Sequence, residues 1–463
     1  MKSAPSVSLV WIVVIALHIL VPRTACFVVP SSCTKHANPT PILAATTSNN
    51  NDGTYYTYKS KKRMELPALM YSICSNAVCK ILRRQYRTVA PSPNDDDPQR
   101  PSPRQRVAIV TGSNTGVGYE TAKSLVEDHG YVVIVAARSP DKGMHACARI
   151  NGAAATAALE ASSSSRGMAV WEGPLDLSDL DSVRSFARRI RETYNATGSI
   201  DVLINNAGVN SAGAAAAPSP PPHDGQQQQQ QQQQQASNLD VVFSANFLGH
   251  FLLTNLLLDQ CRRVVNLSSV MHHFPVYSRS RERDEDHDVG SAAFWKDKAV
   301  MPSDATDGKQ TVRKTYGPSK LAAVLFTSEL QRRYGAGKSI AVNPGAVSSD
   351  IWRNYSRARQ RLFRLLYLTP EQGCLTSVAA AVLDWHDEEE NGGAAAANRA
   401  LYLQPYRLPG AKKDRAPFPL FEMLGPYKGY QATAPRLPKD GGVRASQALF
   451  EVCEELTQCR FPR

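Results

Sequence analysis

The chain has 463 residues, 42% of them hydrophobic, which is enough for one large domain with additions or for two or three smaller domains. The formal net charge is +12, but residues 1–106 hold 14 Lys and Arg against 5 Asp and Glu, so that 12 − 9 leaves only +3 for the remainder. A nucleic-acid-binding domain needs a basic face on its folded part, so this uneven charge argues against nucleic acid as a partner.

Residues 1–63 have the composition of a targeting leader. Lys2 precedes an apolar run of signal-peptide length, which is short for a membrane span, and we expect a signal peptide over residues 1–26. Residues 27–63 are rich in Ser, Thr, Asn and Lys with Asp52 as their one acid, which is typical of a transit peptide. The two parts together resemble the leader of proteins sent to plastids that lie inside the secretory system. The alternative destination is the endoplasmic reticulum or the secretory pathway.

Residues 64–105 connect the leader to the body. The segment from Leu66 to Arg84 has apolar residues at helical spacing, and basic residues follow as far as Arg87. We expect either a helix packed on the body or a basic amphipathic helix, Leu66–Arg87, that makes peripheral contact with an anionic membrane or binds calmodulin. Residues 91–105 are rich in Pro and Asp and are typical of a linker.

The cysteines do not indicate a metal or a set of disulfides. The nine cysteines are scattered along the chain, and none forms a Cys-x-x-Cys pair. Their spacing predicts neither a zinc site nor a disulfide framework, and we expect no metal.

From Arg106 onward, short apolar runs alternate with helical patterns. This alternation predicts an α/β doubly wound parallel sheet, the Rossmann fold, as a single domain over residues 106–457. The expected helices include 119–128 and 180–194, and the expected strands are 106–110, 131–136, 168–171, 201–205, 263–267, 339–343 and 401–403.

Three segments interrupt this pattern. Residues 211–237 contain ten consecutive glutamines and are predicted to be a disordered insertion. Residues 279–288 are a mixed charge run typical of a solvated loop. Residues 404–443 are rich in Pro, Gly, Lys and Arg and are predicted to be an irregular surface excursion.

A glycine-rich segment follows the first expected strand. Gly112 allows a sharp turn, and Gly116 and Gly118 let the backbone approach a diphosphate at a helix N-terminus. The alternative is an ordinary strand-to-helix turn. The predicted cofactor-binding residues are Gly112, Ser113, Asn114, Thr115, Gly116, Val117 and Gly118.

The end of the second expected strand bears on the choice of cofactor. A carboxylate there binds the ribose 2′-hydroxyl of NAD, whereas an arginine suits the 2′-phosphate of NADP. The segment contains Arg138 and no carboxylate before Asp141. Because a guanidinium offers a planar fork of donors to phosphate, we expect NADPH/NADP+. The alternative for Arg138 is a solvated loop residue.

Tyr316 and Lys320 form a Tyr-x-x-x-Lys pair. Residues four apart share one face of a helix, so the Lys320 ammonium can lie beside the Tyr316 phenol. A nearby cation favours the phenolate, and we therefore expect a lowered tyrosine pKa that suits proton transfer to a carbonyl oxygen.

These motifs together resemble the short-chain dehydrogenase/reductase (SDR) superfamily. The resemblance includes the glycine turn, the Asn205-Asn206-Ala207-Gly208 segment, Ser269 and the Tyr316/Lys320 pair. Four further segments are similar to the retinol-dehydrogenase-like branch: residues 246–257, 265–269, 343–345 and 449–456. Ser269 and Tyr316 are further apart than in compact relatives, and the glutamine tract follows Gly208 closely.

The resemblance implies four catalytic roles. Tyr316 is the general acid/base, and Lys320 lowers its pKa and holds the nicotinamide ribose. Ser269 hydrogen-bonds the substrate oxygen, with a plain strand-end serine as the alternative. Asn246 supports a water that relays protons to Lys320, with a helix-capping or turn residue as the alternative.

The resemblance also implies further contacts to the cofactor. Asp176 and Leu177 meet the adenine, although Asp176 alternatively caps the next helix. Pro344 and Gly345 wrap the nicotinamide. The strand-four segment that supports the cofactor is Asn205, Asn206, Ala207 and Gly208.

We therefore expect an NADP(H)-dependent oxidoreductase that interconverts a carbonyl and an alcohol on a small apolar substrate. One alternative is an NADP(H)-sensing binding protein at the plastid envelope, with Leu66–Arg87 as its partner-binding element. A second alternative is an enzyme similar to protochlorophyllide reductase, although such enzymes usually lack the Asn-Asn-Ala-Gly segment kept here.

Overall fold

The computed structural model describes residues 105–161, 167–195, 200–210, 238–273, 288–301, 315–335, 337–353, 355–383, 402–405, 430–433, 437–438, 440 and 442–462. The expected leader, the expected helix at Leu66–Arg87 and the glutamine-rich insertion lie outside these ranges and stay predictions.

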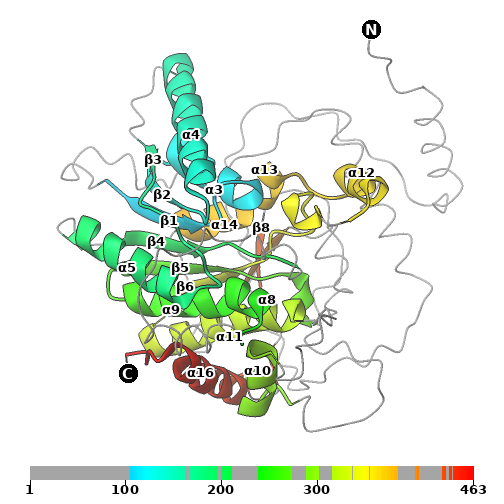
Figure 1. Cartoon of the computed structure of the whole chain (residues 1–463). Helices are drawn as coiled ribbons and strands as arrows, with labels where there is room; N and C mark the ends of the chain where they lie inside the picture. The colour runs from blue at the N-terminus through cyan, green and yellow to red at the C-terminus, as the bar shows by residue number, and fades with distance from the viewer. Residues whose placement is uncertain are drawn as a thin grey trace, which may run out of the picture.

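Within the described residues, eight strands form one sheet in the order β3-β2-β1-β4-β5-β6-β7-β8 (Figure 1). All neighbours are parallel except β8, which runs antiparallel to β7. The strands are β1 (Val107–Thr111), β2 (Val132–Ala136), β3 (Met168–Val170), β4 (Ile200–Asn205), β5 (Cys261–Leu267), β6 (Ser339–Val342), β7 (Tyr402–Pro405) and β8 (Tyr430–Thr433). The strand order reverses between β1 and β4, and ligands of open α/β sheets bind at such a point, outside the carboxyl ends of the strands.

Helices cover both faces of the sheet (Figure 1). Helices α3, α4 and α14 lie on one face, and α5, α9, α11 and α16 lie on the other. The helices are α3 (Gly116–Glu127), α4 (Pro140–Ala161), α5 (Leu180–Tyr194), α8 (Val241–Phe243), the π-turn η3 (Ser244–Leu248), α9 (Gly249–Leu257), the 3-10 turn η4 (Val270–His273), α10 (Ala292–Ala299), α11 (Tyr316–Tyr334), the 3-10 turn η6 (Asp350–Trp352), α12 (Arg357–Leu366), α13 (Pro370–Gly373), α14 (Leu375–Val382) and α16 (Val443–Thr457).

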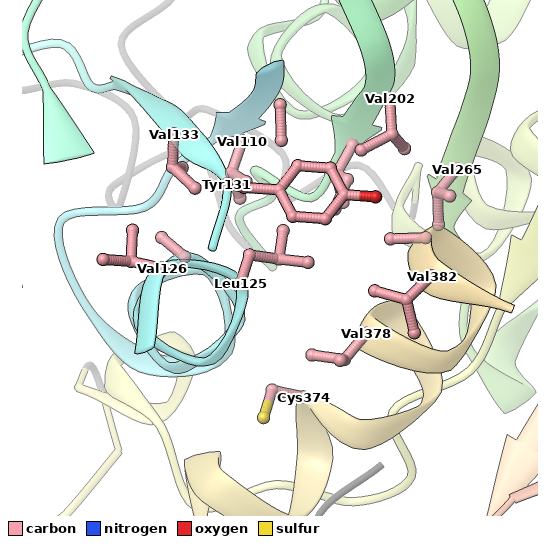
Figure 2. Close-up of a cluster of buried hydrophobic side chains, with 14 of the residues drawn as sticks. Val110, Leu125, Val126, Tyr131, Val133, Val202, Val265, Cys374, Val378 and Val382 are labelled. Atoms are coloured by element: carbon pink, nitrogen blue, oxygen red, sulfur yellow. The ribbon is translucent and has the colours of Figure 1, made fainter. Parts of the chain in front are cut away.

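Strand β1 explains why the sheet needs two helical layers. Successive side chains of a strand point to opposite faces, and all five residues of β1 are buried. Ala108 and Val110 pack with α3 and α14, whereas Val107 and Ile109 pack with α5 and α9. Figure 2 shows the first of these layers, in which side chains of α3 and α14 meet those of β1, β2, β4 and β5, together with Tyr131 just before β2 and Cys374 just before α14. The labelled residues are Val110, Leu125, Val126, Tyr131, Val133, Val202, Val265, Cys374, Val378 and Val382.

The second layer contains a cluster of phenylalanines that joins distant parts of the chain. Phe251 of α9 packs against Phe326 of α11 and Phe450 of α16, with ring centroids 5.5 and 5.2 Å apart. Phe461, beyond α16, packs on Phe251 with its ring centroid at 4.8 Å. The C-terminal segment is therefore part of the domain core.

The predicted fold class and most predicted elements are confirmed. The sheet is doubly wound, and α5 has the predicted bounds. The strands match within two residues at each end, and β8 adds an antiparallel edge to the parallel sheet. Helix α3 begins at Gly116, three residues earlier than predicted, because the glycine turn itself supplies its first residues. Helix α16, from Val443 to Thr457, contains the segment 449–456 that resembles the retinol-dehydrogenase-like branch.

The prediction of an irregular excursion over residues 404–443 is wrong in part. Residues 430–433 form β8, which pairs with β7 from Tyr402 to Pro405. A strand of four residues among Pro and Gly has too little periodicity to be recognised, because its pairing partner is the only feature that defines it.

Within the described part of the chain, none of the helices combines the length and the apolar composition that crossing a membrane requires.

Candidate active site

The predicted site residues gather at the carboxyl ends of the strands on both sides of the point where the strand order reverses. The glycine turn follows β1, Arg138 follows β2 and the Asn205–Gly208 segment ends β4. Ser269 follows β5, and Pro344 and Gly345 follow β6.

The glycine turn depends on glycine at three positions. Gly112 and Gly116 have φ values of +65° and +60°, in the left-handed region that favours glycine. A Cβ atom on Gly112 would lie 2.9 Å from the Ala207 Cα, and one on Gly118 would lie 2.6 Å from the Gly112 carbonyl oxygen. The turn therefore brings the N-terminus of α3 directly against the ends of β1 and β4.

Among the other residues of the turn, some side chains stabilise the turn and others are accessible to a ligand. The buried Ser113 hydroxyl donates to the Val110 carbonyl at 2.6 Å, so Ser113 stabilises the turn itself. Val117, in the first turn of α3, is partly buried and packs its side chain against the core. Asn114 is half-buried and Thr115 is exposed, so these two side chains are accessible at the start of the helix.

The loop after β6 lies opposite the glycine turn. Gly345 has φ +79°, and its N–H donates to Asn343 Oδ1 at 3.0 Å, which fixes the Pro344–Gly345 bend. Further along the loop, Ser349 Cβ lies 3.4 Å from the position that a Cβ on Gly116 would occupy. The Thr115 hydroxyl donates to Asp350 at 2.8 Å. The two loops are thus in direct contact at the start of α3.

The segment after β4 supports the site through its amides. Asn205 Nδ2 donates to Thr254 and Asn266, at 2.9 and 2.8 Å, inside the second layer. Asn206 Nδ2 donates to the Thr111 carbonyl at 2.7 Å, and the N–H groups of Asn206 and Ala207 donate to the Thr111 hydroxyl. Asn206 and Ala207 thus join the end of β4 to the end of β1, and the support of the cofactor by this segment stays a prediction.

Asn246 lies in the π-turn η3, a kind of helix irregularity that is frequent at functional sites. Its Oδ1 accepts from the Val209 N–H at 2.7 Å, and its Nδ2 donates to the Val209 carbonyl at 2.9 Å and to the Ser319 hydroxyl at 3.1 Å. The side chain thus holds the backbone just after Gly208. The relay water stays a prediction.

Tyr316, Ser269 and Lys320 come together where β5 ends and α11 begins. The side chains of Tyr316 and Ser269 are hydrogen-bonded to each other. Lys320 is only 3% exposed, and its Nζ donates to the Leu267 carbonyl at 3.0 Å while lying 5.6 Å from the centre of the Tyr316 ring. The spacing of four residues therefore places both groups on one face of α11, as predicted.

The pKa of Tyr316 is raised, not lowered as we expected, and the predicted contribution of Lys320 stays a prediction. Burial raises the pKa of the Tyr316 phenol, and the hydrogen bond with Ser269 opposes that rise only in part. Burial also lowers the pKa of Lys320 to about 8. The Lys320 ammonium donates to the Leu267 carbonyl and is itself desolvated. The spacing of two residues on a helix therefore could not predict whether burial or the nearby cation has the larger effect on the tyrosine pKa. A tyrosine with a raised pKa keeps its proton at neutral pH and suits proton donation.

On the opposite side of β1, Arg138 and Asp176 face each other. Arg138 Nη1 lies 3.9 Å from Asp176 Oδ2, and the arginine side chain is 38% exposed. The other carboxylate oxygen of Asp176 accepts from the N–H and hydroxyl of Ser178, whereas the N-cap of α5 is Asp179. Asp176 is therefore not the cap of that helix. The Leu177 side chain is buried in the core, so only its backbone is available to a ligand.

Comparison with known proteins identifies the family. The model of the family "short chain dehydrogenase" matches residues 106–281. Retinol dehydrogenase 11 of Mus musculus is 32% identical over 289 residues, covering 60% of this chain and 74% of that protein. The chain belongs to the short-chain dehydrogenase/reductase family.

Other relatives of this short-chain dehydrogenase are similar over the same region. Polyprenol dehydrogenase of Homo sapiens is 32% identical over 303 residues, covering 62% of this chain and 75% of that protein. Among solved structures, salutaridine reductase from Papaver somniferum covers 60% of this chain and 96% of its own, with 20% identity and a TM-score of 0.38. The retinol dehydrogenases among the relatives agree with the predicted branch, and the chain is an oxidoreductase of this family.

The site of this short-chain dehydrogenase fits the nicotinamide cofactor that the family uses. Gly112, Gly116 and Gly118 keep side chains out of the turn at the start of α3, where a diphosphate can meet backbone N–H groups. The loop after β6 lies beside this turn, and Lys320 lies where β5 ends, next to Tyr316.

Sequence reasoning missed two side chains that organise this site. No role is predicted for Thr111 from the sequence, yet its hydroxyl accepts hydrogen bonds from two N–H groups at the end of β4. His250 is likewise given no role of its own within the segment 246–257, yet its Nε2 lies 2.8 Å from the Thr111 hydroxyl. A buried polar residue inside an apolar helical run was the available signal for His250.

Proposed function

We propose that the chain is an NADP(H)-dependent oxidoreductase that interconverts a carbonyl and an alcohol on an apolar substrate, with Tyr316 as general acid/base. The meeting of the Tyr316 phenol with Ser269 and Lys320 carries this proposal, because it combines a proton donor, a second hydroxyl and a buried cation at one point.

The chemistry divides among these groups. The nicotinamide, when bound, exchanges a hydride with the carbonyl carbon. The hydroxyls of Tyr316 and Ser269 hydrogen-bond the carbonyl oxygen, and Tyr316 donates its proton to that oxygen as negative charge develops there. The Lys320 ammonium, 5.6 Å from the tyrosine ring centre, then stabilises the phenolate that remains.

Arg138 supports the choice of NADP(H). It lies at the end of β2 with its guanidinium partly exposed, on the side of the site away from Tyr316. A 2′-phosphate brought there offers a dianion, with which the guanidinium pairs more strongly than with the Asp176 carboxylate at 3.9 Å.

The names of the relatives support an apolar substrate. Retinol dehydrogenase 11 and polyprenol dehydrogenase are named for apolar alcohols. The test is NADPH consumption by the full chain against a panel of apolar aldehydes and ketones, with NADPH binding measured separately by fluorescence. Turnover with some of these compounds supports the proposal, whereas tight NADPH binding with no turnover on any of them favours a binding or sensing protein.

A further inference from the structure

His250 occupies a buried position between the two halves of the site. It lies on α9, four residues after Asn246, and is only 3% exposed. Its Nε2 is 2.8 Å from the Thr111 hydroxyl at the end of β1, and its Nδ1 is 3.1 Å from the Asn246 carbonyl oxygen in the π-turn. One side chain thus contacts both the strand that leads into the glycine turn and the turn that carries Asn246.

The partners determine which nitrogen holds the proton. A carbonyl oxygen can only accept, so the contact with Asn246 requires a proton on Nδ1. Burial and the nearby Lys320 lower the pKa of His250 to about 3, although the bond to Asn246 opposes them, so the ring is neutral. Its Nε2 therefore carries no proton and accepts a hydrogen bond from the Thr111 hydroxyl.

This donation orients the Thr111 hydroxyl. A hydroxyl has one hydrogen and two lone pairs. With its hydrogen on His250, Thr111 has both lone pairs for the N–H groups of Asn206 and Ala207, at 2.9 and 3.0 Å. The contact to the Ile204 carbonyl is longer, at 3.3 Å, and competes for the same hydrogen. His250 thus favours the orientation that joins the end of β4 to the glycine turn.

The other end of His250 acts on the catalytic side. Asn246 holds the backbone of Val209 and the hydroxyl of Ser319. A Cβ on Gly208 would lie 3.3 Å from Asn246 Oδ1 and 3.4 Å from Lys320 Nζ, so this turn and the lysine border the same space. A shift of the π-turn therefore moves the wall beside Lys320.

We propose that His250 is a positioning residue that links the glycine turn to the π-turn of Asn246, and that its two hydrogen bonds act separately on NADPH affinity and on turnover. The inference rests on the function proposed above and deepens it. The Thr111 bond acts through the glycine turn on cofactor affinity, and the Asn246 bond acts through the wall beside Lys320 on kcat.

Three substitutions in the full chain separate the two bonds. His250→Phe keeps a ring but removes both bonds. His250→Gln can place its amide oxygen where Nε2 lies and accept from Thr111, but it leaves the Nδ1 position empty of a donor. His250→Asn can donate to the Asn246 carbonyl but is too short to reach Thr111. The measurements are the NADPH Kd, kcat at saturating NADPH, and the folded fraction from the melting curve.

We expect His250→Phe to weaken NADPH binding and to lower kcat, each about tenfold per folded molecule, because each lost buried hydrogen bond corresponds to about one such factor. His250→Gln is expected to recover the affinity and not kcat, and His250→Asn to recover kcat and not the affinity. His129→Phe is the matched control, since His129 is equally buried but lies between α3 and β2, at the opposite end of the strands.

The proposal is overturned if all three variants differ only in folded fraction, as the control does, while Kd and kcat per folded molecule stay at the wild-type values. It is also overturned if Gln and Asn recover the same parameter. The NADPH Kd is measured without substrate. It therefore tests the effect of the Thr111 bond on NADPH affinity even when no substrate in the panel is turned over. A wild-type chain that binds neither NADPH nor NADH contradicts the proposed function itself.

Discussion

Two ionisable side chains four residues apart, Tyr316 and Lys320, have pKa values shifted in opposite directions by the same cause. Burial raises the pKa of the phenol and lowers that of the ammonium to about 8. At neutral pH the tyrosine is therefore protonated and the lysine is still largely charged. This pairing favours carbonyl reduction, in which the tyrosine must begin as a donor.

The lowered pKa of Lys320 predicts how kcat depends on pH at alkaline pH. Above about pH 8, Lys320 loses the charge that stabilises the phenolate, so kcat for reduction is expected to fall as pH rises through this value. In Lys320→Arg the guanidinium stays charged, so the fall of kcat is expected at higher pH even if the overall rate drops. The measurement is kcat from pH 6 to 10 for both proteins, and identical pH profiles would show that Lys320 is not the group that titrates.

Arg138 predicts a change in cofactor preference rather than in catalysis. Removing the guanidinium in Arg138→Ala eliminates a charge-assisted contact to a 2′-phosphate, which typically contributes about 1.5–3 kcal/mol. We expect NADPH binding to weaken by roughly 10- to 100-fold, while NADH binding stays nearly the same. Titration of both cofactors checks this, and an unchanged NADPH/NADH affinity ratio contradicts the assignment.

At the level of elements, the site depends on close contacts that only short side chains permit. The first turn of α3 fits against the ends of β1 and β4 because Gly112 and Gly118 have no Cβ. The loop after β6 approaches Gly116 from the other side. The glycine spacing in the sequence was enough to predict this turn, because each glycine corresponds to a specific steric need.

A pair of glycine substitutions tests that steric need. In Gly118→Ala the new methyl group would lie 2.6 Å from the Gly112 carbonyl, so the turn must shift and NADPH binding is expected to be lost or strongly weakened. Gly152, in α4, has no atom within 4 Å of its Cβ position, and Gly152→Ala is expected to stabilise the protein by up to ~1 kcal/mol. Melting curves and NADPH titrations of both variants are the measurements. Equal behaviour of the two variants would show that the turn tolerates a side chain.

The sequence predicts local features of these elements better than contacts between them. The strands, the glycine turn and the Tyr316/Lys320 pair each have a short, periodic or fixed-spacing signature. Strand β8 has none, because pairing with β7 defines it. The sequence also gives no signature for the bond between His250 and Thr111, which are 139 positions apart, or for the raised pKa of Tyr316, which depends on burial by the folded chain.

At the scale of the whole molecule, helix α16 completes the layer that contains α11, the helix of Tyr316 and Lys320. Phe450 packs against Phe251, Phe326 and Phe461, with ring centroids between 5.2 and 5.6 Å. Tyr316, the proposed general acid/base, is the first residue of α11, so packing on the far side of this helix supports the candidate site.

This arrangement predicts that a substitution in α16, far from Tyr316, strongly lowers the free energy of unfolding. Phe450→Ala removes a fully buried ring and is expected to cost about 3–5 kcal/mol of stability. Val443→Ala changes an exposed residue of the same helix and is the matched control, with an expected effect within about 0.5 kcal/mol. Denaturant unfolding measures both, and a small effect of Phe450→Ala would show that α16 is not part of the cooperative core.

The most direct test of the proposed function is the comparison of wild type with Tyr316→Phe, in NADPH consumption and in NADPH binding. Phenylalanine keeps the ring but removes the hydroxyl that bonds to Ser269 and donates the proton. We predict that turnover of every substrate in the panel falls by at least about 10²-fold while the NADPH Kd stays within a few-fold of wild type. Turnover that persists in Tyr316→Phe would contradict the account, because the proton would then come from another group.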